Sequence, residues 1–95
     1  MRFQWDPKKA ASNLKKHGVS FEDATTVFGD PLAGTVSDRV HSSSESRFAT
    51  IGQSVNSRLI VVVHADREDD IRIISARIAT TREKKKYAEG QEEDV

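Results

Sequence analysis

The sequence predicts a small α+β domain in which helices pack on one sheet. Helix start signals occur near both ends of the chain, and the stretch over 32–78 has the patterning of strands. The chain has 95 residues, of which 36% are hydrophobic and 32% are charged, which suits one core and not two domains. We therefore expect a single domain over 1–90 and an acidic tail over 91–95.

Two helices are expected near the N-terminus. Asp6-Pro7 supplies an N-cap acceptor followed by a proline in the first turn, and Gly18 gives a stop signal, so the first helix should cover 7–17. Ser20 begins a pattern that resembles a capping box, and apolar residues follow it at helical spacing. The second helix should therefore cover about 21–28.

Four strands and a last helix should follow. The expected strands cover 32–37, 47–53, 58–65 and 71–78, joined as a meander that is antiparallel throughout. The third strand contains the apolar run Leu59–Val63 and should lie at the centre of the sheet. Thr80 begins a capping box, which predicts a basic C-terminal helix to about Glu89. A short extra strand is an option at Arg2–Trp5.

Composition excludes several kinds of chemistry. The chain has no cysteine, which removes disulfides, thiolate nucleophiles and cysteine-based zinc sites. Its apolar runs are too short for a membrane span or a secretion signal, so we expect a cytoplasmic protein without membrane contacts. The three histidines lack the spacing of a metal site and the glycines form no phosphate-binding loop, so no metal and no cofactor is expected.

The charges are unevenly distributed along the chain. Fifteen basic residues balance fifteen acidic ones, but four acidic residues lie in the last seven positions, so the chain up to Ala88 has a net charge of +4. A basic body attracts phosphates, although the same charges also suit ordinary solvated faces.

The most informative segment for chemistry runs from Ile71 to Arg77. An arginine at the end of a strand can present its planar donors to a phosphate, and Arg77 has that position; a salt-bridged arginine is the alternative. Strand alternation puts Arg72 on the opposite face, so the two arginines share a site only if a twist or bulge intervenes. His17, at a helix end after two lysines, is a candidate general acid or base, with helix capping as the alternative.

Several sequence phrases together resemble the BrnT toxins of type II toxin–antitoxin systems. The phrases are Phe3-Gln4-Trp5-Asp6-Pro7, Asn13-Leu14-Lys15-Lys16-His17-Gly18-Val19-Ser20-Phe21, Asp30-Pro31-Leu32, Arg47-Phe48, Ile51-Gly52 and Arg72-Ile73-Ile74-Ser75-Ala76-Arg77, extended by Arg82-Glu83 and Tyr87. The resemblance runs from Phe3 to about Gly90. It implies a RelE-like fold and a metal-independent ribonuclease that inhibits translation. It also implies a cognate antitoxin that neutralises the toxin and through which any contact with operator DNA is made.

Site roles follow as hypotheses from this resemblance and from the chemistry of the side chains. We expect phosphate binding and transition-state stabilisation by Arg77, Arg72 and Arg47, proton transfer by His17 or Glu45, RNA backbone contacts by Lys16 and Arg82, and base stacking by Tyr87. For Tyr87 the alternative is attachment of the last helix to the sheet.

Two other functions remain open at this point. A toxin of the same fold could act on a protein target, and a basic face could also serve a binding module without catalysis. RNA cleavage would separate a ribonuclease from both of these alternatives.

Overall fold

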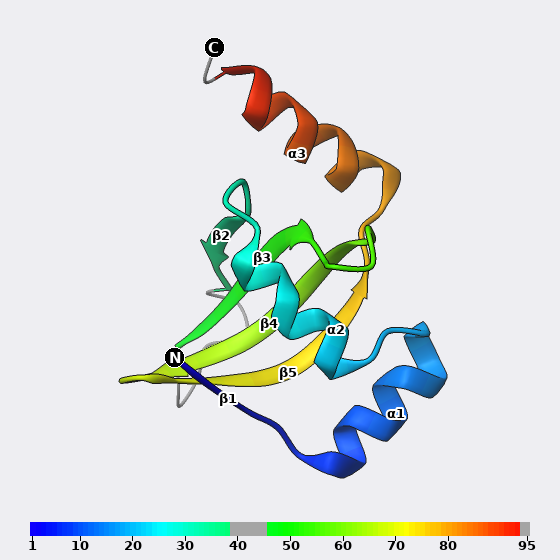
Figure 1. The fold of residues 1–95 in the computed structure, drawn as a ribbon, viewed down its shortest axis with the longest axis vertical. Coiled ribbons are helices and arrows are strands. Elements are labelled where there is room, and N and C mark those ends of the chain that lie inside the picture. The colour runs from blue at the N-terminus through cyan, green and yellow to red at the C-terminus, as the bar shows by residue number, and fades with distance from the viewer. Residues whose placement is uncertain (39–45, 94–95) are drawn as a thin grey trace.

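The computed structural model describes residues 1–38 and 46–93 of the chain (Figure 1). Its elements, in chain order, are β1 (Arg2–Gln4), α1 (Pro7–His17), α2 (Phe21–Thr25), the 3₁₀ turn η1 (Thr26–Gly29), β2 (Gly34–Ser37), β3 (Arg47–Gln53), β4 (Leu59–Arg67), β5 (Asp70–Ile78) and α3 (Thr81–Glu93). The strands form one sheet in the order β1-β5-β4-β3-β2. Among the described residues, no helix is long and apolar enough to cross a membrane.

The sheet has five strands and is mixed, so the expectation of four antiparallel strands is wrong at one edge. β2 to β5 are antiparallel neighbours, but β1 pairs in parallel with β5, placing Phe3 beside Ile71. The optional strand near the N-terminus therefore forms. The three residues of β1 are too few for a sequence pattern to show whether the strand runs parallel or antiparallel to its neighbour. Asp70 helps to fix the parallel direction by accepting hydrogen bonds from Arg2 (2.9 Å) and Gln4 (2.8 Å).

The helix signals hold at the start of each helix and less well at the ends. The Asp6 side chain accepts a hydrogen bond from the Lys8 amide at 2.8 Å, and Gly18 ends α1 in the left-handed region at φ 68°. The second expected helix is shorter, because α2 tightens into η1 after Thr25. The last helix begins as expected but extends to Glu93.

β5 contains one extra residue relative to β4. Val63 pairs with Ser75 but the next residue, His64, pairs with Ile73, so Ile74 is a bulge without a cross-strand partner. The bulge reverses the alternation along β5. Arg72 and Arg77 consequently emerge on the same face of the sheet, and the expectation of opposite faces is wrong because strict alternation fails at an inserted residue.

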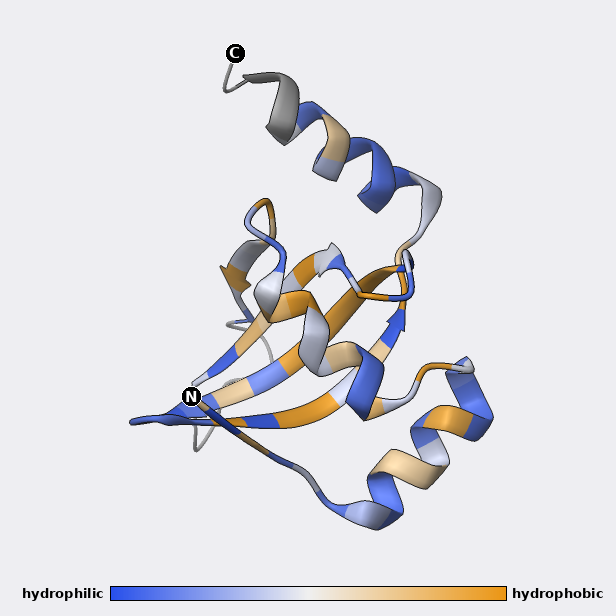
Figure 2. Cartoon of the chain, in the orientation of Figure 1, coloured by the Kyte–Doolittle hydropathy of each residue, from blue (hydrophilic) through white to orange (hydrophobic). Residues whose placement is uncertain are grey.

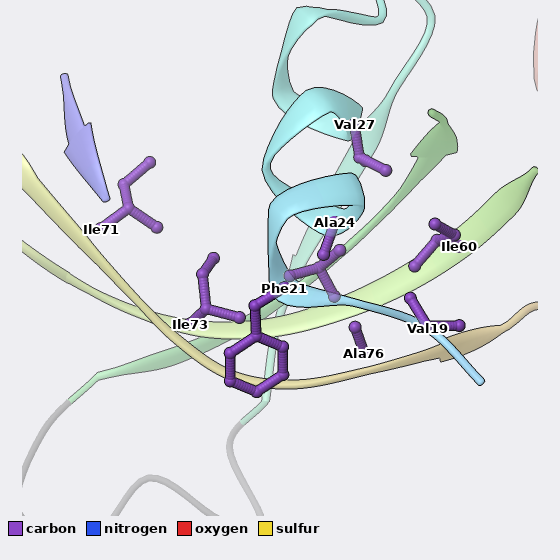
Figure 3. Close-up of a cluster of buried hydrophobic side chains, with 9 residues drawn as sticks. Val19, Phe21, Ala24, Val27, Ile60, Ile71, Ile73 and Ala76 are labelled. Atoms are coloured by element: carbon purple, nitrogen blue, oxygen red, sulfur yellow. The ribbon is translucent and has the colours of Figure 1, made fainter. Parts of the chain in front are cut away.

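The hydrophobic core lies between the sheet and the segment 19–27, which contains α2 and the first part of η1 (Figure 3). Its members come from the helical segment and from the two central strands: Val19, Phe21, Ala24, Val27, Ile60, Val62, Ile71, Ile73 and Ala76. In Figure 2 the strands under α2 are largely apolar, whereas α3 is mostly hydrophilic and leads away from the sheet. α1 and α2 therefore cover one face of the sheet only.

The buried side chain of Asn13 joins α1 to the open edge of β5. Its amide nitrogen donates to the carbonyls of Ala76 (2.8 Å) and Val19 (3.0 Å), and its oxygen accepts from the Ala76 amide at 3.1 Å. Asn13 thus takes the place of a neighbouring strand beyond the end of β1, and it satisfies backbone groups that would otherwise be buried unpaired.

Replacing this amide should destabilise the fold. We expect Asn13→Ala to lower the free energy of unfolding by about 2–4 kcal/mol, because three buried backbone groups lose their partner. Urea denaturation followed by circular dichroism measures the change. Ser12→Ala, at the preceding exposed position, is the control and should stay within about 0.5 kcal/mol of the parent. Equal stability of the two variants would show that water replaces the amide at no cost.

Candidate active site

Three arginines gather on the face of the sheet opposite α1 and α2, which we call the arginine face. Arg47 on β3 pairs with Ala65 on β4, and Ala65 pairs with Arg72 on β5. Cross-strand partners share a face, so the two arginines flank Ala65 with their Cα atoms about 10 Å apart. Neither side chain is isolated, because both make further interactions in the structure.

Arg77 lies on the same face, opposite Val61 and about 15 Å along β5 from Arg72. Its guanidinium donates two hydrogen bonds to the Glu83 carboxylate of α3, at 2.7 and 2.9 Å. These bonds raise the pKa of Arg77, and they lower the pKa of Glu83 to about 2 against the opposing effect of burial. The salt-bridged alternative is therefore the observed state of Arg77.

The end of α1 adds further basic groups beside β5. Lys9, Ser12 and Lys16 form a stripe along α1 and line a cleft of about 200 Å³ with His17 and Ser75. Ser75 is the cross-strand partner of Val63, which lies on the same face of β4 as Ala65 and two residues before it. The structure thus brings His17 and Lys16 to the edge of the sheet next to the arginine face. Both side chains are exposed.

The remaining predicted residues lie elsewhere or serve the fold. Arg82 is exposed in the first turn of α3, and Glu45 lies outside the described residues. The Tyr87 hydroxyl donates to Asp30 at 2.5 Å, so this tyrosine attaches α3 to the rest of the fold. Burial raises the pKa of Asp30, but hydrogen bonds from Tyr87 and from the amides of Gln53 and Leu32 outweigh it and lower the pKa overall.

Sequence reasoning missed several of these positions. Lys9 and Ser12 precede Lys16 at helical spacing, which places all three on one side of α1. This spacing could have predicted that they line one surface. Ser75 could not be found, because its placement depends on the bulge.

His64 is a buried residue whose ring makes two hydrogen bonds. It is 2% exposed and joins Thr50 (2.7 Å) to Asp66 (2.6 Å). In the stretches that the structure describes, no three histidine, aspartate or glutamate side chains gather closely enough to hold a metal ion.

The arrangement suits the binding of a polyanion. Guanidinium groups form paired, charge-assisted hydrogen bonds with phosphate oxygens, and Arg47 and Arg72 place two such groups on one face of the sheet. Lysine side chains and a histidine at the neighbouring helix extend the surface in one direction. Charge stabilisation at a phosphate, together with a titratable group nearby, is the chemistry that this surface offers.

The ion pair between Arg77 and Glu83 predicts a pH-dependent stability. The pKa of Glu83 is lowered from 4.5 to about 2, so its contribution is complete above pH 4.5 and is lost as the pH falls toward 2. Because the pair is partly exposed, we expect it to contribute about 1 kcal/mol or less to the free energy of unfolding. The thermal midpoints of the parent and Glu83→Gln should differ most near neutral pH and converge near about pH 2.

Glu89→Gln, on the same helix, is the matched control. It removes a carboxylate other than the Glu83 carboxylate that Arg77 binds. The difference in thermal midpoint between Glu89→Gln and the parent should therefore not disappear as the pH falls from 4.5 toward 2. If the parent and Glu83→Gln differ by the same amount at every pH, the ion pair does not stabilise α3.

Comparison with known proteins identifies the family. No curated protein matches the chain. The crystal structure of the Brucella abortus ribonuclease toxin BrnT has a similar fold, with a TM-score of 0.65 and 24% sequence identity over 85% of this chain and 99% of that chain. The family model for the ribonuclease toxin, BrnT, of type II toxin–antitoxin systems matches residues 5–83. The chain therefore belongs to the BrnT family of type II toxin–antitoxin systems, as the sequence phrases predicted.

Proposed function

We propose that this chain is a metal-independent endoribonuclease that binds and cleaves RNA on its arginine face and thereby inhibits translation. The family is one of ribonuclease toxins, which gives the class of reaction. The observation that supports the location is the bulge at Ile74, since it sets Arg72 on the same face as Arg47, across Ala65. Paired guanidinium groups on a rigid sheet are suited to a phosphodiester.

The proposed reaction uses the RNA's own 2′-hydroxyl as the nucleophile. Its oxygen forms a bond to the adjacent phosphorus, the bond from phosphorus to the 5′-oxygen breaks, and a 2′,3′-cyclic phosphate results. One proton leaves the 2′-hydroxyl and one reaches the departing 5′-oxygen, so the step balances without a further reactant. The charge that develops on the phosphorane oxygens is what arginines stabilise. DNA lacks the hydroxyl and should not react.

The roles follow the position of each side chain. Arg47 and Arg72 bind the scissile phosphate and stabilise its transition state. Lys16 holds the RNA backbone where α1 meets β5, and His17 transfers a proton there. Glu45 stays a second candidate for proton transfer.

Three residues of the proposal lie at α3 or at its junction with the sheet. Arg82 contacts the RNA backbone at the start of α3. An RNA base can stack on the ring of Tyr87 while the tyrosine hydroxyl stays bonded to Asp30. Arg77 lies between the surface and α3. It acts on the phosphate if RNA displaces Glu83, and otherwise it positions α3.

The proposal includes a cognate antitoxin that neutralises the toxin in the cytoplasm. A type II toxin–antitoxin system implies a protein antitoxin. A partner that covers the arginine face would exclude RNA by occupying the same charges. Contact with operator DNA would belong to the antitoxin and not to this chain.

The first test is cleavage of end-labelled RNA in EDTA. We expect the parent to produce 2′,3′-cyclic phosphate ends and to leave an all-DNA strand intact. Arg72→Gln and Arg47→Gln should each reduce the cleavage rate roughly 10²–10³-fold, because each removes a donor to the developing charge. Arg58→Gln is the matched control. Arg58 lies on the opposite face, where it donates to the Gly18 carbonyl at 3.0 Å, and its loss should leave the rate within about twofold.

Two variants separate the possible roles of Arg77 in the same assay. If Arg77 binds RNA, Glu83→Gln frees its guanidinium and keeps cleavage, whereas Arg77→Gln loses it. If Arg77 acts only through α3, both variants lose activity together. RNA that stays intact with a folded parent would instead favour a protein-targeting toxin or a non-catalytic binding module.

A further inference from the structure

A groove of about 630 Å³ lies on the same face of the sheet as the three arginines, between the sheet and α3. Its floor consists of Ala49, Ile51 and Val61, which are apolar side chains of β3 and β4. Glu83, whose carboxylate binds Arg77, lines one end of the groove. The groove is therefore continuous with the proposed RNA surface but has a different, apolar character.

The walls of the groove leave apolar surface in water. Leu32 is 52% exposed and Val36 is 67% exposed, and both line the groove from the side of β2. On the other wall α3 contributes Lys86, Tyr87 and Gly90. A lysine and a glycine cannot fill the space above an aliphatic floor, so α3 overhangs the groove without closing it. Apolar side chains from another molecule would complete this second small core.

β2 offers a backbone edge along the same groove. It is the last strand of the sheet, and its sequence Gly34-Thr35-Val36-Ser37 contains neither a charge nor a proline. Sheet edges are normally protected by such residues. Pairing with β3 and a 2.7 Å hydrogen bond between the hydroxyls of Thr35 and Thr50 hold the strand in place. Among the residues that the structure describes, no strand pairs with the outer edge of β2, so this edge can pair with an extended segment.

A strand that adds to β2 would direct every second side chain into the groove. There these side chains would meet Val36 and the space beside Gly34, where an added Cβ would have no atom within 4 Å. The backbone would supply the hydrogen bonds of a sheet ladder, and the groove would supply pockets for apolar side chains.

The charges around the groove select among occupants. The first half of α3 carries four basic residues, namely Arg82, Lys84, Lys85 and Lys86. They attract a segment with acidic residues beside its apolar ones. A second copy of this chain would bring its own basic helix to the same place, and RNA would lay phosphates over an aliphatic floor. An acidic and apolar protein segment fits best.

We infer that this groove is the docking site of the antitoxin, through an extended segment that pairs with β2 and places apolar side chains on Ala49, Ile51 and Val61. The inference rests on the proposed function in that the toxin–antitoxin system supplies the partner. It adds the site, the conformation and the chemistry of the bound segment.

Calorimetric titration of the purified chain with its cognate antitoxin tests the inference. Val36→Asp should weaken binding at least about tenfold, because it removes an apolar contact and repels acidic side chains. Val55→Asp is the matched control. Val55 is a valine with 76% exposure in the turn between β3 and β4, and its replacement should leave the affinity unchanged.

Two further variants keep the test independent of the stability of Val36→Asp. Gly34→Phe introduces a ring where the free chain has open space, so it should fold normally and block the groove. Lys86→Glu, which lies on the groove, should weaken binding more than Lys84→Glu, which does not line it. Antitoxin binding should also protect the amides of 34–37 from hydrogen exchange.

Several outcomes would overturn the inference. Parent-like affinity of folded Gly34→Phe and Val36→Asp would place the antitoxin elsewhere. If the free parent forms a dimer and Val36→Asp makes it a monomer, the occupant of the groove is a second copy of this chain. If Val36→Asp and Gly34→Phe lose RNA cleavage but bind the antitoxin as the parent does, the occupant is RNA. The proposed function fails in a separate measurement, if the parent without antitoxin leaves RNA intact. That outcome does not change the affinities measured for the antitoxin.

Discussion

The extra residue in β5 is the constraint on which the rest of the structure depends. On one side of the bulge the sheet must bury Ile71 and Ile73 under the helices, and on the other side it must bury Ala76. An uninterrupted strand could place only two of these three residues in the core, because the spacing from Ile73 to Ala76 is odd. The bulge at Ile74 resolves the conflict. The same insertion moves Arg72 to the face of Arg77, so the requirement for a continuous core also produces the arginine face.

The bulge also determines how the helical layer attaches to the sheet. β1 covers the β5 edge only as far as Arg72, and beyond that point the edge would be open. Asn13 closes it by bonding both backbone groups of Ala76, the core residue two positions after the bulge. Since α1 is fixed at this point, its stripe of Lys9, Ser12 and Lys16 lies along the bulged segment and reaches Ser75. A backbone requirement of the fold thus places the basic side chains of α1 beside those of the sheet.

The parts that the sequence predicted are those whose causes are local. Asp6, Gly18, Ser20 and Thr80 act on backbone groups within a few residues, so the helix starts followed from their spacing. The apolar run of β4 likewise predicted the central strand. The parallel pairing of β1 with β5 and the bonds between Asn13 and Ala76 join residues more than 60 positions apart, and no local pattern carries that information. The bulge depends on the register between β4 and β5, which strict alternation within β5 does not reveal. The candidate site inherits this division: its residue types followed from the sequence phrases, but the shared face of Arg72 and Arg77 did not.

Polar contacts, and not burial in the core, hold α3 in position. The helix is attached through Glu83 to Arg77 and through Tyr87 to Asp30, and none of its side chains over 81–90 belongs to the core. Glu83 neutralises one arginine at the edge of the proposed RNA surface, whereas Lys86 lines the groove above the aliphatic floor. A segment bound in the groove would contact the helix that holds Arg77, and RNA that attracts Arg77 would release Glu83 toward the groove. The two surfaces therefore share one ion pair, and binding at either one changes the electrostatics of the other.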